Sequence, residues 1–226
     1  MLVDQSLKNP QPLRPEQCPA YIMAGGRSSR FGSDKARVQV DDSPLLLALR
    51  CELIRQGHSV EIVADRANRY ADLGVECLVD WQADQGPVAG VATALKHREQ
   101  HQPGWLLLLS CDLLVWRAAW FKQLSGVLEQ LPSAADGAAT EDAGEMRQDI
   151  DAVAFQMRTA AGELRAEPFP SLLHSRLWPQ AVALLDRQKR SLQSLFADAR
   201  TMTIDTQDNP QAWSFNTVEQ LQALFL

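Results

Sequence analysis

Apolar and polar positions alternate in blocks along this chain, and the blocks predict a succession of buried strands. A short apolar run from Tyr21 to Ala24 stops at Gly25-Gly26, similar runs occupy 60–64 and 75–79, and the longest covers Trp105–Leu109. Continuous apolar runs of this length are typical of parallel strands whose two faces are both covered. Each of these runs is therefore predicted to be a strand of one buried sheet.

Segments with helical spacing separate these runs. Apolar residues recur every three or four positions over 46–53, after a predicted helix start at Ser43-Pro44, and over 88–95, after Gly86-Pro87. Residues 116–131 have the character of a further helix. Strands and helices that alternate in this way predict the α/β class, as a single Rossmann-like doubly wound domain with a mostly parallel central sheet.

The two ends and the middle of the chain depart from this pattern. Residues 1–19 hold four of the twelve prolines and few large apolar groups, which predicts a disordered extension ahead of a domain over 20–226. Residues 132–149 are small and acidic, and predict a loop. Beyond it we expect strands at 150–157, 163–167 and 201–205, helices at 171–187 and 191–199, and a last helix opened by a capping box at 217–220.

Charge and composition narrow the possible partners. The net charge of -6 and the pI of about 5.2 argue against a nucleic acid, because phosphate backbones need a basic surface. No apolar run approaches the length of a membrane span, and the amino end lacks the apolar core of a secretory signal. The four cysteines form no Cys-x-x-Cys pair. These features predict a cytoplasmic protein with reduced thiols.

The loop after the first apolar run is the strongest sign of chemistry. Gly25, Gly26 and Gly32 let the backbone approach a ligand, while Arg30 and Lys35 add fixed positive charge. Ligands of open α/β sheets bind at the carboxyl ends of strands, where this loop lies. The glycine spacing fits neither the P-loop nor the Gly-x-Gly-x-x-Gly fingerprint. A binding site for a triphosphate is therefore predicted.

A lone carboxylate follows the longest apolar run. Asp112 stands directly after Ser110-Cys111, at the carboxyl end of the predicted central strand. Mg²⁺ prefers one or two carboxylates together with phosphate oxygens, although an Asp at this place could also cap a helix. The neighbouring phosphate loop favours the metal-binding interpretation.

These segments together resemble a known family. The loop at 22–35 resembles the Leu-Ala-Gly-Gly-x-Ser-x-Arg-Met-Gly-x-Asp-Lys signature of nucleotidyltransferases, with Met23 for Leu and Phe31 for the Met of the signature. Val79-Asp80 with Gly86–Gly90, Ser110–Asp112 and Phe215–Leu221 resemble, in the same order, segments of the molybdenum cofactor guanylyltransferases of the MobA-like nucleotidyltransferase family. The likeness spans about 20–226 and implies the nucleotidyltransferase (GT-A-like) type of fold.

The resemblance implies a role for each matching residue. The backbone at Met23, Ala24, Gly25 and Gly26 lines the nucleotide, Arg30 and Lys35 hold the phosphates, Asp80, Gly86, Pro87 and Gly90 lie beside the nucleoside, Asp112 binds Mg²⁺, and Asn216 lies near the reacting phosphate. The implied reaction transfers GMP from GTP to the terminal phosphate of Mo-molybdopterin and releases pyrophosphate. Molybdoenzymes or other proteins of cofactor biosynthesis are implied as partners.

Other interpretations remain open at this point. Leu114, Ser214 and Val218 stand where the family has Pro, a second Asn and Pro. A cytidylyltransferase for the same cofactor typically carries Ala at the place of Gly25, and sugar-1-phosphate nucleotidyltransferases are usually longer. A protein of another class, which binds a nucleotide or docks a partner without catalysis, is the remaining alternative. The sequence does not identify the residues of the acceptor pocket.

Overall fold

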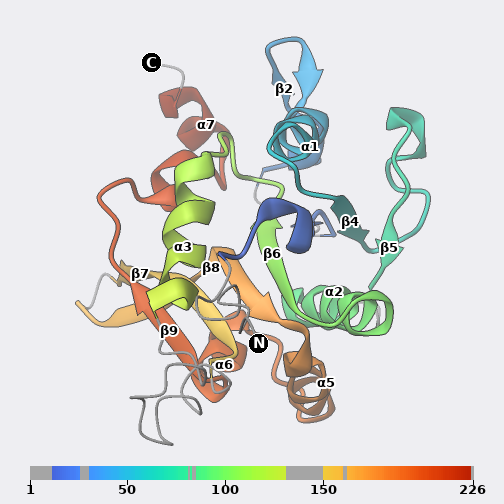
Figure 1. Cartoon of the computed structure of the whole chain (residues 1–226). Helices are drawn as coiled ribbons and strands as arrows, with labels where there is room; N and C mark the ends of the chain where they lie inside the picture. Colours follow the sequence, from blue (N-terminus) through green and yellow to red (C-terminus); the bar gives the residue numbers. More distant parts are fainter. Residues whose placement is uncertain are drawn as a thin grey trace, which may run out of the picture.

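The computed structural model describes residues 12–25, 31–80, 82, 85–130, 150–159 and 162–224. Its strands are β1 (Ala20–Met23), β2 (Gln39–Val40), β3 (Ser43–Pro44), β4 (Val60–Ala64), β5 (Leu78–Val79), β6 (Trp105–Ser110), β7 (Ala152–Arg158), β8 (Leu164–His174) and β9 (Thr201–Ile204). Seven of them form one sheet in the order β5-β4-β1-β6-β8-β7-β9, and β2 pairs with β3 (Figure 1). Within the seven-stranded sheet β8 runs antiparallel to its neighbours, and the other pairs are parallel. The mostly parallel sheet expected from the sequence is confirmed.

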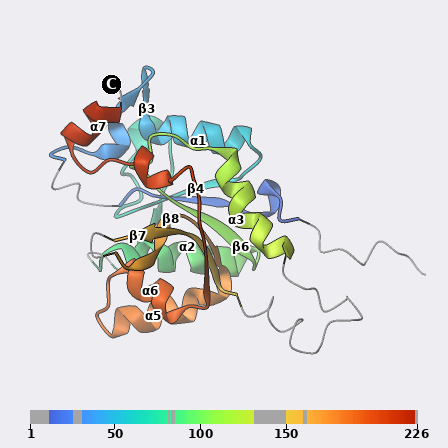
Figure 2. The ribbon, with the colours of Figure 1, turned by 90° about the vertical axis from the view of Figure 1, so that its left-hand side faces the viewer.

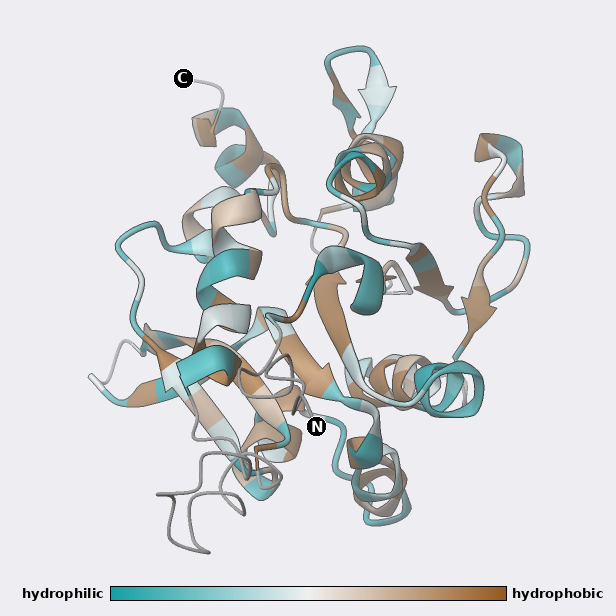
Figure 3. Ribbon diagram, viewed as in Figure 1, coloured by the Kyte–Doolittle hydropathy of each residue, from teal (hydrophilic) through white to brown (hydrophobic). Residues whose placement is uncertain are grey.

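Helices cover both faces of this sheet. They are α1 (Leu45–Arg55), α2 (Pro87–His101), α3 (Ala118–Gln130), α5 (Trp178–Asp186), α6 (Leu192–Asp198) and α7 (Val218–Leu224). In Figure 2, α1 and α3 lie on one side of the sheet and α2, α5 and α6 on the other. Two buried apolar clusters fill the space between these layers, and Figure 3 shows the apolar character concentrated along the central strands. The α/β class is confirmed.

The two central strands show why their sequences are apolar throughout. On β1, Ile22 contributes to the cluster under α1 and α3, while Tyr21 contributes to the cluster under α2 and α5. Leu109 and Leu108 of β6 divide between the two clusters in the same way. A strand with helices on both faces must be apolar at every position. The carboxyl ends of these parallel strands then lie at one edge of the sheet.

Two predicted helix boundaries are wrong. Ser43-Pro44 forms β3, and α1 begins at Leu45 without a side-chain cap. The helix expected from residue 171 starts only at Trp178, because residues 171–174 continue β8 and pair with β6. Leu172 and Leu173 are both fully buried, one in each apolar cluster, so burial against the two helical layers selects the strand.

The segment before β1 belongs to the packed structure more than the sequence suggested. Cys18 is fully buried, the carbonyl oxygen of Pro19 accepts from the amide of Leu107 at 2.9 Å, and Arg98 Nη2 donates to the carbonyl of Gln17 at 2.8 Å. Packing therefore begins before Ala20, the domain start expected from the sequence. Residues 1–11 of the extension predicted over 1–19, and the predicted acidic loop, lie outside the described residues. No helix in the described ranges is long and apolar enough to cross a membrane.

Candidate active site

Three segments that are distant in sequence meet at the ammonium group of Lys35. This residue begins the short 3-10 helix η3 (Lys35–Arg37), and its side chain is 11% exposed. Lys35 Nζ donates to Asp112 Oδ2 at 3.2 Å, to the carbonyl oxygen of Phe215 at 2.9 Å and to Asn216 Oδ1 at 2.8 Å. Lys35, Asp112 and Asn216, which the sequence analysis singled out separately, form one cluster.

Backbone pairing holds the cluster at the end of β6. The amide of Cys111 donates to the carbonyl of Met23 at 3.1 Å, which ties the end of β6 to the end of β1. Phe215 N donates to the carbonyl of Asp112 at 3.3 Å, and Leu113 forms a β-bridge with Ser214. The segment after the 3-10 helix η6 (Pro210–Trp213) is therefore fixed to the metal-binding candidate by main-chain contacts.

Asp34 anchors the loop that carries Lys35. Asp34 Oδ1 accepts from the amide of Ala36 at 3.1 Å, and Asp34 Oδ2 accepts from Arg69 Nη2 at 3.1 Å. The hydroxyl of Tyr70 lies 3.2 Å from both Asp34 oxygens and donates to the carbonyl of Ala24 at 3.0 Å. Burial raises the pKa of Tyr70 well above its ordinary value, so the hydroxyl keeps its proton.

No motif in the sequence indicated the role of Arg69 and Tyr70 in this support. Asp34 precedes Lys35 directly and could have been noticed for that reason. Arg69 and Tyr70 stand in a segment between β4 and β5 whose sequence contains no recognisable motif. Their role is apparent only from their contacts.

A second group of predicted residues meets between β1, β5 and α2. A Cβ added at Gly90 would lie 2.3 Å from Met23 Cε and 3.0 Å from Asp80 Oδ1. At Gly25 an added Cβ would lie 3.2 Å from the backbone nitrogen of Asp65. Both glycines thus stand where neighbouring chain segments leave little room for a side chain. Met23, Asp80 and Gly90 therefore lie together, and Gly25 lies beside the end of β4.

The electrostatics of this second group differ from those at Lys35. Burial and the nearby charge of Asp65 raise the pKa of Asp80 to about 6, although Arg69 acts in the opposite direction. Asp80 lies just after β5, and its amide donates to the carbonyl of Ala64 at 3.0 Å. A carboxylate in this environment favours a partner that donates hydrogen bonds.

The start of α2 lies beside the α5–α6 connection. Gly86 precedes the helix with φ 75°, and Pro87 occupies its first turn. A Cβ at Gly86 would lie 3.1 Å from Cβ of Arg190, which belongs to that connection. The positive φ and this contact explain the glycine, and the proline fits a position that has no intrahelical hydrogen bond to lose.

Two of the predicted residues cannot be placed, whereas the departures at Ser214 and Leu114 have defined hydrogen bonds. Gly26 and Arg30 lie outside the described residues. Ser214 turns its hydroxyl back to the carbonyl of Gln211 at 3.1 Å, and the amide of Leu114 donates to the carbonyl of Trp213 at 2.8 Å. Both departures take part in the pairing between the end of β6 and the segment after η6.

The oxygen atoms around Lys35 suit a hard divalent cation. One carboxylate, one amide oxygen and one backbone carbonyl converge there, and these are the ligand types that Mg²⁺ prefers. No group of three or more His, Cys, Asp or Glu that could hold a metal occurs in the described part of the chain. The arrangement fits a cation that one carboxylate shares with the oxygens of a phosphate ligand.

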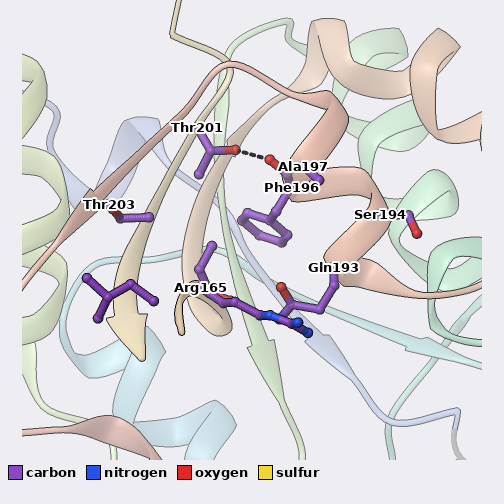
Figure 4. Close-up of a pocket in the computed structure, with 9 residues that line it drawn as sticks. Arg165, Gln193, Ser194, Phe196, Ala197, Thr201 and Thr203 are labelled. Carbon is purple, nitrogen blue, oxygen red and sulfur yellow. Dashed lines mark hydrogen bonds between the residues drawn. The ribbon is translucent and has the colours of Figure 1, made fainter. Parts of the chain in front are cut away.

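A cavity of about 490 Å³ lies on another part of the molecule (Figure 4). Its walls come from β8, β9 and α6, and it is lined by Leu164, Arg165, Ala166, Gln193, Ser194, Phe196, Ala197, Thr201 and Thr203. None of the residues predicted for the nucleotide or the metal lines it. The cavity is therefore separate from the Lys35 cluster.

Comparison with known proteins gives a consistent result. A molybdenum cofactor guanylyltransferase of Photobacterium profundum is 29% identical over 211 residues, which cover 92% of this chain and 95% of that protein. A probable molybdenum cofactor guanylyltransferase of a Nostoc species is 34% identical over 209 residues, which cover 91% of this chain and 89% of that protein.

The fold agrees with a solved structure. The molybdopterin-guanine dinucleotide biosynthesis protein A of Archaeoglobus fulgidus superposes with a TM-score of 0.67 at 14% identity, covering 91% of this chain and 95% of the other. The family described as the MobA-like NTP transferase domain matches residues 20–203. This chain belongs to the MobA-like NTP transferase domain family of nucleotidyltransferases.

Proposed function

We propose that this protein transfers GMP from GTP to the terminal phosphate of a molybdopterin acceptor, as a Mg²⁺-dependent molybdenum cofactor guanylyltransferase. The observation that carries the proposal is the convergence of Lys35, Asp112 and Asn216 at the carboxyl end of β6. The names of the relatives from Photobacterium and Nostoc support the choice of acceptor and nucleotide.

The chemistry needs charge neutralisation and positioning. An oxygen of the acceptor phosphate attacks the α-phosphorus of GTP, the bond from that phosphorus to the β-phosphate oxygen breaks, and pyrophosphate leaves. The acceptor phosphate is already ionised near neutral pH, so no side chain has to remove a proton. Lys35, and Arg30 by the family resemblance, would offset the charge of the triphosphate and of the leaving pyrophosphate.

Asp112 and Asn216 are the residues that would hold Mg²⁺. Their oxygens lie within hydrogen-bond distance of the same ammonium group, so both side chains reach the same place at the end of β6. When bound, Mg²⁺ supplies positive charge to the phosphate oxygens. Lys35 keeps the Asp112 carboxylate oriented toward this place.

Met23, Gly25, Asp80 and Gly90 would hold the nucleoside. The partly buried carboxylate of Asp80 suits the N–H groups of the guanine edge, and it lies beside Gly90, where the absence of a side chain lets the chain segments pack closely. Gly25 favours GTP over CTP, because the cytidylyltransferase relatives typically carry Ala at its place.

A nucleotide panel tests the proposal. Pyrophosphate release is measured with GTP, CTP, UTP and ATP, each with and without molybdopterin and Mg²⁺. We expect release with GTP only when molybdopterin and Mg²⁺ are present. Preference for CTP would reassign the protein to the cytidylyltransferases, and nucleotide binding without turnover for any acceptor would support a non-catalytic role.

A further inference from the structure

Glu167 is a buried carboxylate on β8 that neither the sequence motifs nor the proposed reaction uses. The pairing of β7 with β8 shifts between Ala154, which is opposite Ser171, and Phe155, which is opposite Glu167, so that residues 168–170 have no counterpart on β7. Phe155 packs in the apolar cluster under α1 and α3. Because directly paired residues share a face of the sheet, the side chain of Glu167 points to the face that carries η6 and Asp112.

The environment of Glu167 is unfavourable for a charge. The residue is 7% exposed, and burial raises its pKa to about 7, with the charge of Asp112 acting in the same direction. Its Oε1 accepts from the amide of Phe169 at 3.4 Å, and its Oε2 accepts from the side-chain amide of Gln211. An acid at such a place is costly, and a specific contact is the usual reason for its presence.

The contact with Gln211 leads directly to the Lys35 cluster. The carbonyl oxygen of Gln211 accepts from the amide of Ser214 at 3.2 Å and from its hydroxyl at 3.1 Å. The next two residues are Phe215 and Asn216, whose oxygens accept from Lys35. These hydrogen bonds, together with the backbone between Gln211 and Asn216, connect β8 through η6 with the ammonium group of Lys35.

A second attachment holds the same segment from the other side. Asp208 Oδ2 accepts from Arg117 Nη1 at 3.0 Å and from Trp120 Nε1 at 3.1 Å, both on or next to α3. This attachment fixes the distance of the segment from α3. The Glu167–Gln211 contact lies on the sheet side and comes closer in sequence to Asn216.

We propose that Glu167 is a positioning residue, whose hydrogen bond with Gln211 holds residues 211–216 so that Phe215 and Asn216 orient Lys35 beside Asp112. The inference rests on the proposed function for its kinetic consequence, but not for its structural one. A directional hydrogen bond fixes the segment in one orientation, whereas an apolar contact at the same place would not.

The test uses Glu167→Ala, Gln211→Ala, the double variant, and the exchanged pair Glu167→Gln with Gln211→Glu. Gln193→Ala is the matched control, because Gln193 Nε2 donates at 2.9 Å to the carbonyl of Ala166, the neighbour of Glu167. With GTP, Mg²⁺ and molybdopterin we expect each single Ala variant to lose about tenfold in kcat at unchanged KM for both substrates. The double variant should lose no more than the worse single one, and the exchanged pair should recover most of the loss.

Hydrogen exchange of the backbone amides gives a readout that needs no substrate. We expect faster exchange at Phe215 and Asn216 in Glu167→Ala and Gln211→Ala, and unchanged exchange there in Gln193→Ala and in the exchanged pair. Unchanged exchange in the two Ala variants would overturn the inference even if activity fell. If the wild-type protein released no pyrophosphate, the proposed function would fail while this measurement still decided the inference.

Two kinetic outcomes would also overturn it. A higher KM for molybdopterin in Glu167→Ala at unchanged kcat would make the residue an acceptor contact. Additive losses in the double variant, without recovery in the exchanged pair, would show that the two side chains act separately.

Discussion

The candidate site has two halves at the edge of the sheet, one beside β1, β4 and β5 and the other beside β8. They differ in how far their residues can be predicted from local sequence. On the β1–β4–β5 side, Gly25, Asp80 and Gly90 stand in short motifs that follow or flank predicted strands. On the β8 side, Glu167 contacts Gln211 and Asn216 contacts Lys35, each through a side-chain hydrogen bond between segments that are distant in sequence. A nucleotide site can be predicted from local sequence because its motifs are short and continuous, whereas the other half depends on which segments pack together.

Loss of the charge at Asp112 should have the largest effect, because this residue lies where the two halves meet. Asp112→Asn keeps an oxygen for Lys35 but lacks the negative charge that a cation needs. We expect the fold to persist and turnover to fall by about 100-fold or more, with a higher Mg²⁺ requirement. Pyrophosphate release across a Mg²⁺ titration measures this. An unchanged titration curve would remove the metal assignment.

Lys35→Ala should have the second largest effect, and it should lower both turnover and stability. The contribution of a charge-assisted hydrogen bond is about 1.5–3 kcal/mol, so turnover should fall about tenfold or more. Because Lys35 is buried among three acceptors, we also expect a loss of about 1–3 kcal/mol in the free energy of unfolding. Lys122→Ala, at an exposed position on α3, is the control for both measurements. A stability equal to the wild type would contradict the network around Lys35.

Gly90→Ala probes the nucleotide half alone. The added methyl group would crowd Met23 and Asp80, so we expect a severalfold higher KM for GTP, with kcat little changed. Gly126→Ala is the matched control, because nothing lies within 4 Å of the position of its Cβ in α3. It should stabilise the protein by about 0.5–1 kcal/mol through helix propensity and leave KM unchanged. Equal KM values in both variants would argue against a nucleoside at Gly90.

Asp80→Asn should have the smallest effect, which is a change in the free energy of unfolding. The size of this change depends on pH. The pKa of Asp80 is raised to about 6, so the folded state binds the proton more tightly than the unfolded chain. Ionisation therefore lowers stability as pH rises from about 4 to about 6, and the cost remains above that range. We expect the variant to match the wild type below about pH 4 and to be more stable above about pH 6 in urea unfolding.

Replacement of Asp151, which precedes β7, should change the stability in the opposite direction. Burial acts to raise its pKa, but hydrogen bonds from Arg200 and Arg176 lower it overall. Asp151→Asn should therefore be less stable than the wild type at neutral pH, and the difference should disappear as the pH falls through the lowered pKa. If the stabilities of Asp80→Asn and Asp151→Asn changed in the same direction at neutral pH, the electrostatic contrast between Asp80 and Asp151 would be wrong.

Local sequence was sufficient to predict the α/β class and the central strands, and it supplied the residues of the proposed nucleotide site. The strands can be predicted because a strand covered on both faces must be apolar throughout, as Trp105–Leu109 is. The site can be predicted because ligands of such sheets bind at the ends of the strands, where glycines and charged residues follow in the sequence. The sequence also placed Asp112 at a strand end and Thr217 as the N-cap of α7, where Thr217 Oγ1 accepts from the amide of Gln220 at 3.2 Å. The reciprocal bond expected of a capping box differs, because Gln220 Oε1 accepts from the amide of Asn216 at 2.6 Å.

Contacts between distant segments set the remaining features of the fold and the site. Ser43-Pro44 became a strand rather than a helix start, and residues 171–174 joined β8, because pairing and burial outweigh local helix signals. Arg69 and Tyr70 support Asp34, and Glu167 contacts Gln211, through side chains that are 35 to 44 residues apart in sequence. Such contacts leave no periodic trace in the chain. They exist only once the sheet has brought the segments together, since a single polar residue has no preferred partner until packing supplies one.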